Sequence, residues 1–220
     1  MRTTATFVPT AEAAFIAGLT DRDMNRVIDE HIVPDALVRV DKGRVFVRLA
    51  AAFARFYFGT EDQFVAGLRR KILSDLTHRL EQRADRVVVF DLLHMPKGID
   101  WRVSVPFAQI DVTSFIQEAL ERARQVERAH ALVHVDPELM GGVPVFCGTR
   151  VVIDVVTASL ERGVGQARLS ASYPFLTDEH IAAARIYAKV HPRRGRPKRL
   201  ADVHPNWTVK SSRVVRPAKA

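Results

Sequence analysis

The segment from Ala131 to Val190 constrains the fold most strongly, because glycines and prolines divide it into short pieces. Two apolar runs, ALVHV and VPVFC, are separated by the turn DPELMGG, and a Gly-Thr-Arg turn follows the second run. Gly163 and Pro174 then end two helical patterns, and Thr177 is placed to cap a last helix over residues 178–190. This order predicts a short β-hairpin followed by three helices.

The same segment, from Asp136 to His191, resembles the bacterial domain of unknown function number 433. The pattern of that family is Asp-Pro, Gly-x-Pro, Gly-Thr-Arg, a helix ending in Gly, and Tyr-Pro-x-Leu-Thr before a final helix. The chain carries the pattern at Asp136, Pro137, Gly142, Pro144, Gly148, Thr149, Arg150, Gly163, Tyr173, Pro174, Leu176 and Thr177.

Cys147 lies between the second apolar run and Gly148, which raises the question of nucleophilic catalysis. A cysteine nucleophile needs a base to raise its thiolate fraction, and no His and acid pair is placed beside it by sequence. We therefore expect a buried structural cysteine, no catalytic residue and no enzyme activity. Thr149 and Arg150 are expected to fix the turn through hydrogen bonds, and the alternative for Arg150 is contact with a partner.

The start of the chain carries the signals of two short helices. Thr10 is placed to cap the segment AEAAFIA, Gly18 ends it, and Thr20 caps a second helix with Asp23 at its third position. A helix, a glycine turn and a helix make a helix-turn-helix arrangement. The second helix, over residues 21–31, places apolar residues on one face and polar residues on the other.

A β-hairpin follows in the segment ALVRVDKGRVFVRLA, which alternates apolar and polar residues around Asp41-Lys42-Gly43. With the two helices it resembles the winged-helix domains of the MerR type, over residues 1–58. The alternative is an ordinary helical layer with solvated cations, and the acids beside the arginines favour that alternative. From the DNA-binding interpretation we expect contacts by Arg22, Asn25, Arg26, Lys42 and Arg44.

Residues 59–130 are expected to link the two ends and to supply a dimer surface. The pattern Thr60-Glu61-Asp62-Gln63 is typical of a capping box and predicts a helix over residues 60–84. RVVVFDLL and WRVSVPFAQIDV are predicted as two strands, and residues 114–129 as a helix. The aromatic cluster before this segment is assigned to the core rather than to base stacking: Phe53, Phe56, Tyr57 and Phe58.

The positive charge is concentrated at the end of the chain. Residues 191–220 hold nine Lys and Arg against one Asp, a net +8, whereas the first 190 residues balance 24 cations against 24 acids. Such a segment binds an acidic partner, either the minor groove of DNA or the carboxylate-lined Mg²⁺ site of a nuclease. Trp207 is either an interface anchor or a residue of the protein's own core. The candidate toxin-binding residues of segment 192–220 are Arg193, Arg194, Arg196, Lys198, Arg199, Trp207, Arg213 and Arg216.

The complete order resembles VapB-type antitoxins, whose toxins are typically nucleases of the PIN or PIN-like class. With 47% hydrophobic residues, one cysteine and no membrane-length apolar window, the chain predicts a cytoplasmic α+β, mainly helical protein. Its expected parts are residues 1–58, 59–130, 131–191 and 192–220. The resemblance implies a cognate nuclease and operator DNA as partners. We expect a homodimer or higher oligomer, because one winged helix contacts few base pairs. Without a Cys/His cluster of zinc-like spacing or a membrane-length apolar run, we expect no metal and no membrane, and no cofactor. The alternative is a stand-alone transcription factor or architectural protein that uses the winged helix and an AT-hook-like tail.

Overall fold

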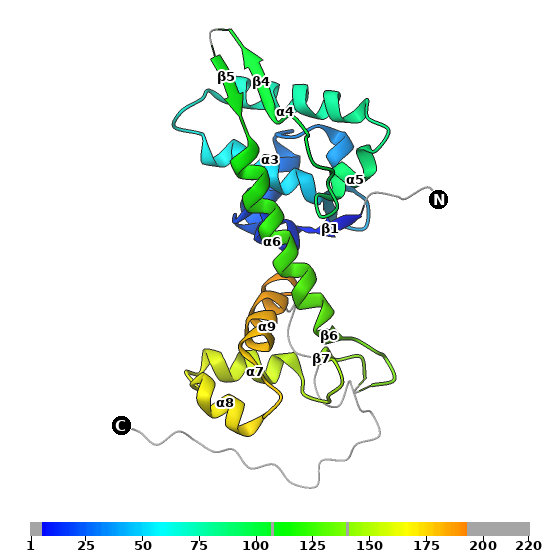
Figure 1. The fold of residues 1–220 in the computed structure, drawn as a ribbon, viewed down its shortest axis with the longest axis vertical. Coiled ribbons are helices and arrows are strands. Elements are labelled where there is room, and N and C mark those ends of the chain that lie inside the picture. The colour runs from blue at the N-terminus through cyan, green and yellow to red at the C-terminus, as the bar shows by residue number, and fades with distance from the viewer. Residues whose placement is uncertain (1–5, 107, 140, 193–220) are drawn as a thin grey trace.

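The computed structural model describes residues 6–106, 108–139 and 141–192. Figure 1 shows two lobes joined at a narrow waist, which the long helix α6 (Thr113–Ala131) crosses from one lobe to the other. Helices make up most of both lobes, and the strands form small antiparallel sheets. The chain is therefore α+β and mainly helical, as the sequence predicts.

The N-terminal lobe begins with a three-stranded sheet packed beside two helices. The strand order is β1-β3-β2, and β3 pairs with both neighbours, through Phe7 with Val47 and Val38 with Phe46. The hairpin around Gly43 is confirmed, whereas β1 was not predicted because it is so short. The elements are β1 (Phe7–Pro9), α1 (Thr10–Ala17), α2 (Asp21–Asp29), a 3₁₀ turn (Asp35–Leu37), β2 (Val38–Val40) and β3 (Arg44–Val47).

The turn between α1 and α2 has the predicted chemistry. Gly18 ends α1 in the left-handed region, with φ of 63°. Thr20 caps α2: its hydroxyl oxygen accepts a hydrogen bond from the backbone N–H of Asp23 at 3.1 Å, and the Asp23 carboxylate accepts one from the N–H of Thr20 at 3.3 Å. The helix-glycine-helix order is thus confirmed. Thr10, however, does not cap α1 as predicted: it is the first residue of the helix, and its hydroxyl donates to the backbone carbonyl of Arg44 at 3.4 Å.

The middle of the chain differs from its prediction in three places. Thr60 ends a helix instead of starting one, because its hydroxyl donates to the carbonyl of Phe56 and the next helix begins at Ala66. The valine-rich RVVVFDLL forms a helix, since packing of Val89 and Phe90 into the core overrides strand propensity. WRVSVPFAQIDV is a hairpin rather than one strand. The elements are α3 (Arg48–Gly59), α4 (Ala66–Glu81), α5 (Arg86–Asp91), β4 (Arg102–Val105) and β5 (Ala108–Asp111).

The core of the N-terminal lobe lies mainly around α3. The aromatic residues Phe53, Phe56 and Tyr57 are buried there, which confirms their assignment to the core. Trp101 also joins this core, although no sequence signal pointed to it. Helix α6 closes one side through Ile116, Ala119, Ala123 and Val126.

The C-terminal lobe has the predicted hairpin and three helices. Its core is smaller and gathers around Phe146 and Ile153. Thr177 caps α9, as predicted, by accepting a hydrogen bond from the N–H of His180. Val190, at the end of α9, is buried in the core of the N-terminal lobe and so ties the two lobes together. The elements are β6 (Val133–His134), β7 (Val145–Phe146), α7 (Ile153–Glu161), α8 (Gln166–Ser172) and α9 (Asp178–Val190).

The turn after β7 corrects two predictions. Cys147 is exposed rather than buried, because β7 ends at Phe146 and Cys147 stands in the turn that follows the strand. The Thr149 hydroxyl donates to the carbonyl of Phe146 and accepts from the N–H of Val151, as expected. Arg150 is exposed, and within the described ranges its side chain forms no hydrogen bond that would fix the turn.

No described helix has the length and apolar character needed to cross a membrane. Within the same residues, His, Cys, Asp and Glu side chains form no group of three or more that could hold a metal ion.

Candidate nucleic-acid interface

Helix α2 and the β2–β3 hairpin form one continuous surface. The Arg44 guanidinium, at the start of β3, donates to both carboxylate oxygens of Asp29, at 2.9 and 2.7 Å. It also donates to the backbone carbonyl of Asn25 at 3.0 Å. This two-point contact fixes the hairpin against α2, whose inner face buries Met24 and Val27. The outer face of α2 therefore lies beside the hairpin tip.

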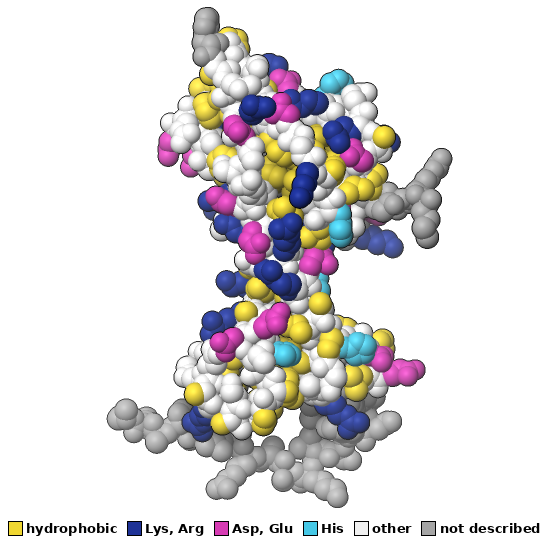
Figure 2. Space-filling model, in the orientation of Figure 1, with side chains coloured by type: hydrophobic (Ala, Val, Ile, Leu, Met, Phe, Trp, Pro, Cys, Tyr) yellow, Lys and Arg dark blue, Asp and Glu magenta, His cyan; other side chains and the backbone are white. Residues whose placement is uncertain are grey.

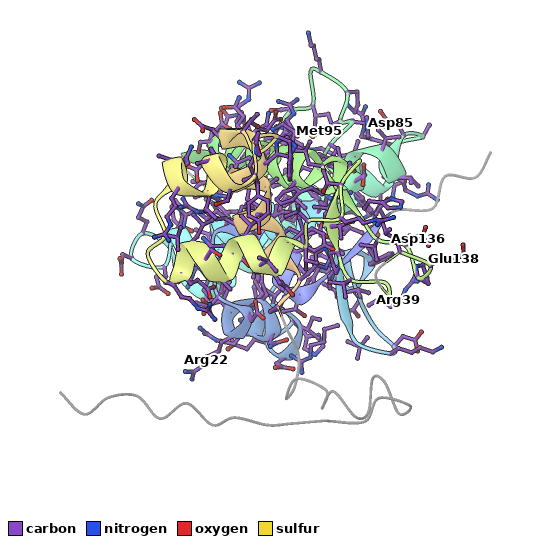
Figure 3. All side chains as sticks on the ribbon, turned by 90° about the horizontal axis from the view of Figure 1, so that it is seen from below. Arg22, Arg39, Asp85, Met95, Asp136 and Glu138 are labelled. Atoms are coloured by element: carbon purple, nitrogen blue, oxygen red, sulfur yellow. The ribbon has the colours of Figure 1, made fainter. Side chains whose placement is uncertain are left out.

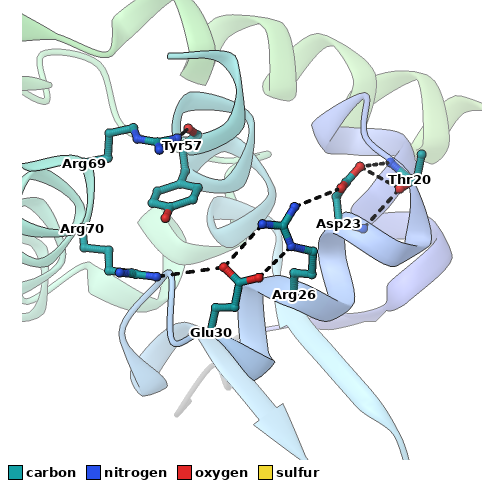
Figure 4. A network of polar contacts seen from close by, with 7 residues as sticks. All are labelled: Thr20, Asp23, Arg26, Glu30, Tyr57, Arg69 and Arg70. Atoms are coloured by element: carbon teal, nitrogen blue, oxygen red, sulfur yellow. Dashed lines mark hydrogen bonds and ion pairs between the residues drawn. The ribbon is translucent and has the colours of Figure 1, made fainter. Parts of the chain in front are cut away.

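Arg26 belongs to a polar network on the outside of α2 (Figure 4). Its Nε donates to the Glu30 carboxylate at 2.7 Å, its Nη1 lies 3.9 Å from Asp23, and its guanidinium lies 5.1 Å from the centre of the Phe58 ring. The Arg70 guanidinium, from α4, lies 4.0 Å from the other oxygen of Glu30. The Glu30 carboxylate is thus shared by two arginines and holds both of them at the surface of α2.

Behind this network, Arg69 connects α4 to the end of α3. Its guanidinium donates to the backbone carbonyl of Tyr57 and lies 4.1 Å from the centre of the Tyr57 ring. Arg69 is buried, with 8% of its surface exposed. It supports the surface from within and is not placed to contact a ligand.

Arg22 and Lys42 are cations of this surface that remain unpaired. Both are exposed, and neither makes a hydrogen bond or ion pair with another described residue. Arg22 points away from the body of the molecule (Figure 3). Of the five predicted residues, these two are free to contact an anion, Arg26 and Arg44 are bound to carboxylates, and Asn25 is half-buried.

Arg39 on β2 is a further cation of this surface that sequence reasoning missed. It is exposed, and its guanidinium lies 4.4 Å from the centre of the Phe7 ring on β1. Arg39 lies only three residues before Lys42 in the same alternating segment, and this spacing could have indicated it. The stacking on Phe7 depends on β1, which was not predicted.

A second charged cluster centres on Arg48, which is buried inside the N-terminal lobe together with Glu12, whereas Glu127 at the edge of the cluster is exposed. Arg48 of α3 donates at 2.7 Å to both Asp91 of α5 and Glu127 of α6, and it lies 3.4 Å from Glu12 of α1. Glu12 is 4% exposed, and this burial raises its pKa although Arg48 opposes the shift. The cluster joins α1, α3, α5 and α6, which indicates a structural role.

The predicted toxin-binding residues lie outside the described residues. They occupy segment 193–220, beyond the end of α9 and Pro192. Helix α9 packs against α6 and α1, so the segment starts from the waist of the molecule. These residues are Arg193, Arg194, Arg196, Lys198, Arg199, Trp207, Arg213 and Arg216.

Comparison with known proteins finds a family match within the C-terminal lobe and a relative that aligns with nearly the whole chain. Residues 133–188 match the family model described as a protein of unknown function (DUF433). The uncharacterized protein y4eO of Sinorhizobium fredii (strain NBRC 101917 / NGR234) is 34% identical over 215 residues, which are 98% of this chain and 95% of that protein. No solved structure matches the chain. The chain therefore belongs to the family of y4eO, and residues 133–188 of its C-terminal lobe match the DUF433 family model.

Proposed function

We propose that this protein is a DNA-binding antitoxin of the VapB type. In this proposal the N-terminal lobe, as a MerR-like winged helix, binds the operator of its own operon in the cytoplasm, and the basic segment after Pro192 binds and inhibits a cognate PIN-like nuclease. The observation that carries the DNA-binding half is the two-point contact of Arg44 with Asp29 and Asn25. It holds the hairpin beside the outer face of α2, as in a winged helix.

The charges on this surface fit a nucleic acid partner. Arg22 and Lys42 are available for phosphate oxygens, and Arg26 stands at the centre of the outer face. One winged helix contacts few base pairs, so we propose a homodimer or higher oligomer that reads two half-sites about one helical turn apart.

The nuclease-inhibiting half rests on charge. A PIN-type nuclease holds Mg²⁺ with Asp and Glu, and Arg side chains pair bidentately with carboxylates. Residues 191–220 carry the +8 net charge of the chain. The arginines in this segment would compete for the carboxylates that hold the metal.

The second candidate is a stand-alone DNA-binding protein that uses the same surface and an AT-hook-like tail. The RRGRPKR sequence favours it, because Arg-Gly-Arg-Pro fits a narrow minor groove. The two functions differ in what removal of the tail abolishes: protection from a nuclease in the first, and affinity for DNA in the second.

The DNA-binding surface is tested by removing its two unpaired cations. Arg22→Ala with Lys42→Ala should weaken binding to the upstream DNA fragment. The slope of log K against log salt should become shallower by about 0.9 for each phosphate that is no longer neutralised. A charge-matched control is Arg83→Ala with Lys97→Ala. This control removes cations near Asp85 and Met95, which lie on the opposite side of the molecule from Arg22 (Figure 3).

The control pair should bind like the wild-type protein. Equal affinity and equal salt slope for both double variants would overturn the assignment of α2 and the hairpin. A third variant, Glu30→Gln, removes the carboxylate that occupies Arg26 and Arg70, and it should tighten DNA binding. Weaker binding by a folded Glu30→Gln protein would contradict the proposed role of Arg26.

A further inference from the structure

A cleft of about 490 Å³ opens where the two lobes meet. The turn between α1 and α2 supplies Gly18 and Thr20, and α2 supplies Asp21. Helix α6 supplies Arg122 and Gln125, and α9 supplies Lys189. On the face drawn in Figure 2, Lys and Arg side chains lie along the waist between the lobes, among several Asp and Glu side chains. Apolar residues of α1 and the following turn complete the lining: Ala11, Ala14, Phe15 and Leu19. We call this space the waist cleft.

The guanidinium of Arg122 lies close to the turn between α1 and α2. A Cβ atom at Gly18 would lie 2.9 Å from Nη1 of Arg122, so only glycine lets the guanidinium approach the backbone this closely. Nη1 lies 3.5 Å from the carbonyl oxygen of Ile16, at the end of α1. Arg122 therefore lies against the backbone at the end of α1, with one long hydrogen bond to it.

The charge of Arg122 is only partly neutralised. Its Nη2 lies 3.7 Å from the Glu118 carboxylate, and the same carboxylate lies 3.5 Å from Nε of Arg55. The Arg122 side chain remains 30% exposed. The Glu118 carboxylate is thus shared by two guanidinium groups and neutralises only part of their charge, which leaves positive charge on Arg122 at the cleft.

Lys189 brings a second cation from the other lobe. It lies in the last turn of α9 and forms no ion pair or hydrogen bond within the described ranges. Gln125 adds a neutral amide that donates or accepts hydrogen bonds. Asp21 is the acid among the lining residues, and it stands at the first position of α2 rather than on α6 or α9.

The waist cleft adjoins the candidate DNA-binding surface at the start of α2. Asp21 lines the cleft, and Arg22, the next residue, points outward from α2. DNA placed along the outer face of α2 would carry a strand past the mouth of the cleft. We propose that Arg122 and Lys189 bind a backbone phosphate of this DNA, which rests on the DNA-binding role proposed above.

This contact would make the DUF433 lobe part of the DNA complex. Lys189 lies on α9, which contributes Ile181 and Ala184 to the core of that lobe, so a phosphate between Lys189 and Arg122 bridges the two lobes. The footprint on DNA then extends beyond the helix-turn-helix. The bound DNA would also hold α9 against the N-terminal lobe.

The test is the salt dependence of binding of the full chain to its upstream DNA fragment. Arg122→Gln with Lys189→Gln should weaken binding and reduce the slope of log K against log salt by about 1 to 2. The matched control is Arg124→Gln with Arg185→Gln, which removes two exposed cations from the same helices outside the cleft. Lys189→Gln alone, at a site without a described polar partner, keeps the test valid if the double variant fails to fold.

The outcomes separate this proposal from the one on which it rests. A loss of slope in the cleft variant, with the control unchanged, supports the phosphate contact. A cleft variant that binds like its control, while Arg22→Ala with Lys42→Ala binds weakly, overturns the cleft proposal and leaves the DNA-binding surface standing. Stabilisation by inorganic phosphate that depends on Arg122 and Lys189, without any change in DNA binding, also overturns it.

Discussion

The two lobes are stabilised by different kinds of interaction. The N-terminal lobe has an extended core and a buried ion cluster in which Arg48 connects four helices. The C-terminal lobe has a small core, and its chain reversals depend on glycines with positive φ and on the Thr149 and Thr177 hydroxyls. The first lobe therefore depends on residues far apart in the sequence, and the second on local turn chemistry.

The largest expected effect comes from breaking the buried ion cluster. Arg48→Ala leaves Glu12 and its neighbouring acids without a buried cation, which should lower the free energy of unfolding by about 3 to 5 kcal/mol. The control is Arg83→Ala, which removes an exposed pair with Asp85 and should cost less than about 1 kcal/mol. Urea unfolding measures both. Equal losses for the two variants would mean that the cluster does not hold the lobe together.

A smaller effect is expected from the turn chemistry of the C-terminal lobe. Gly148 has φ of 72°, and a Cβ added there would have no atom within 4 Å, so Gly148→Ala should cost about 1 to 2 kcal/mol through backbone strain alone. Gly165→Ala is the matched control, because Gly165 has φ of −63° and similar open space. Thermal unfolding should show a lower Tm for the first variant only. A Tm for Gly148→Ala equal to that of the control would refute local strain.

The junction of the lobes should respond to pH. Nε2 of His191 lies 3.0 Å from Nε2 of His130, and burial together with His130 lowers the pKa of His191. His191 therefore binds a proton more readily in the unfolded chain than in the folded one. Its contribution to the free energy of unfolding is fully present above its ordinary pKa of about 6.5 and is lost as the pH falls through its lower folded pKa. His191→Gln should lose less stability than wild type between about pH 7.5 and about pH 5.5, as measured by Tm. Parallel plots of Tm against pH for the two proteins would contradict a pH-dependent role of His191.

The smallest effect is expected at Cys147. Because the residue is exposed, Cys147→Ser should change the free energy of unfolding by no more than about 0.5 kcal/mol. A buried thiol would instead give a loss of about 1 to 3 kcal/mol, since a hydroxyl would be desolvated. Urea unfolding of the variant decides between the two environments.

Local signals explain which parts of the fold the sequence predicted. Gly18 and Thr20 end and begin helices through contacts within a few residues, and so does Thr177, so their roles are visible in the sequence. Thr60 has the same local pattern but the opposite role, because α3 occupies the preceding residues and its last turn takes the hydroxyl hydrogen bond. Segment 86–91 likewise becomes helical through packing that no local pattern records.

The candidate interface shows the same limit. Arg22 and Lys42 were predicted as exposed cations, and the structure places them so. The pairing of Arg44 with Asp29 joins residues 15 positions apart across two elements, and the position of Arg70 beside Glu30 depends on how α4 packs. The tertiary structure was therefore needed to tell which arginines are paired with a carboxylate and which are free to bind DNA.

In the proposed function the N-terminal lobe binds DNA, and the basic C-terminal segment inhibits the nuclease. Co-expression with the neighbouring nuclease tests this assignment most directly. A chain ending at Pro192 keeps every described element and loses the basic segment. We expect it to lose protection of cells from the nuclease while it retains binding to the upstream DNA fragment. Full protection by this shortened chain, together with a collapse of its affinity for DNA, would contradict the antitoxin function and favour the stand-alone DNA-binding protein.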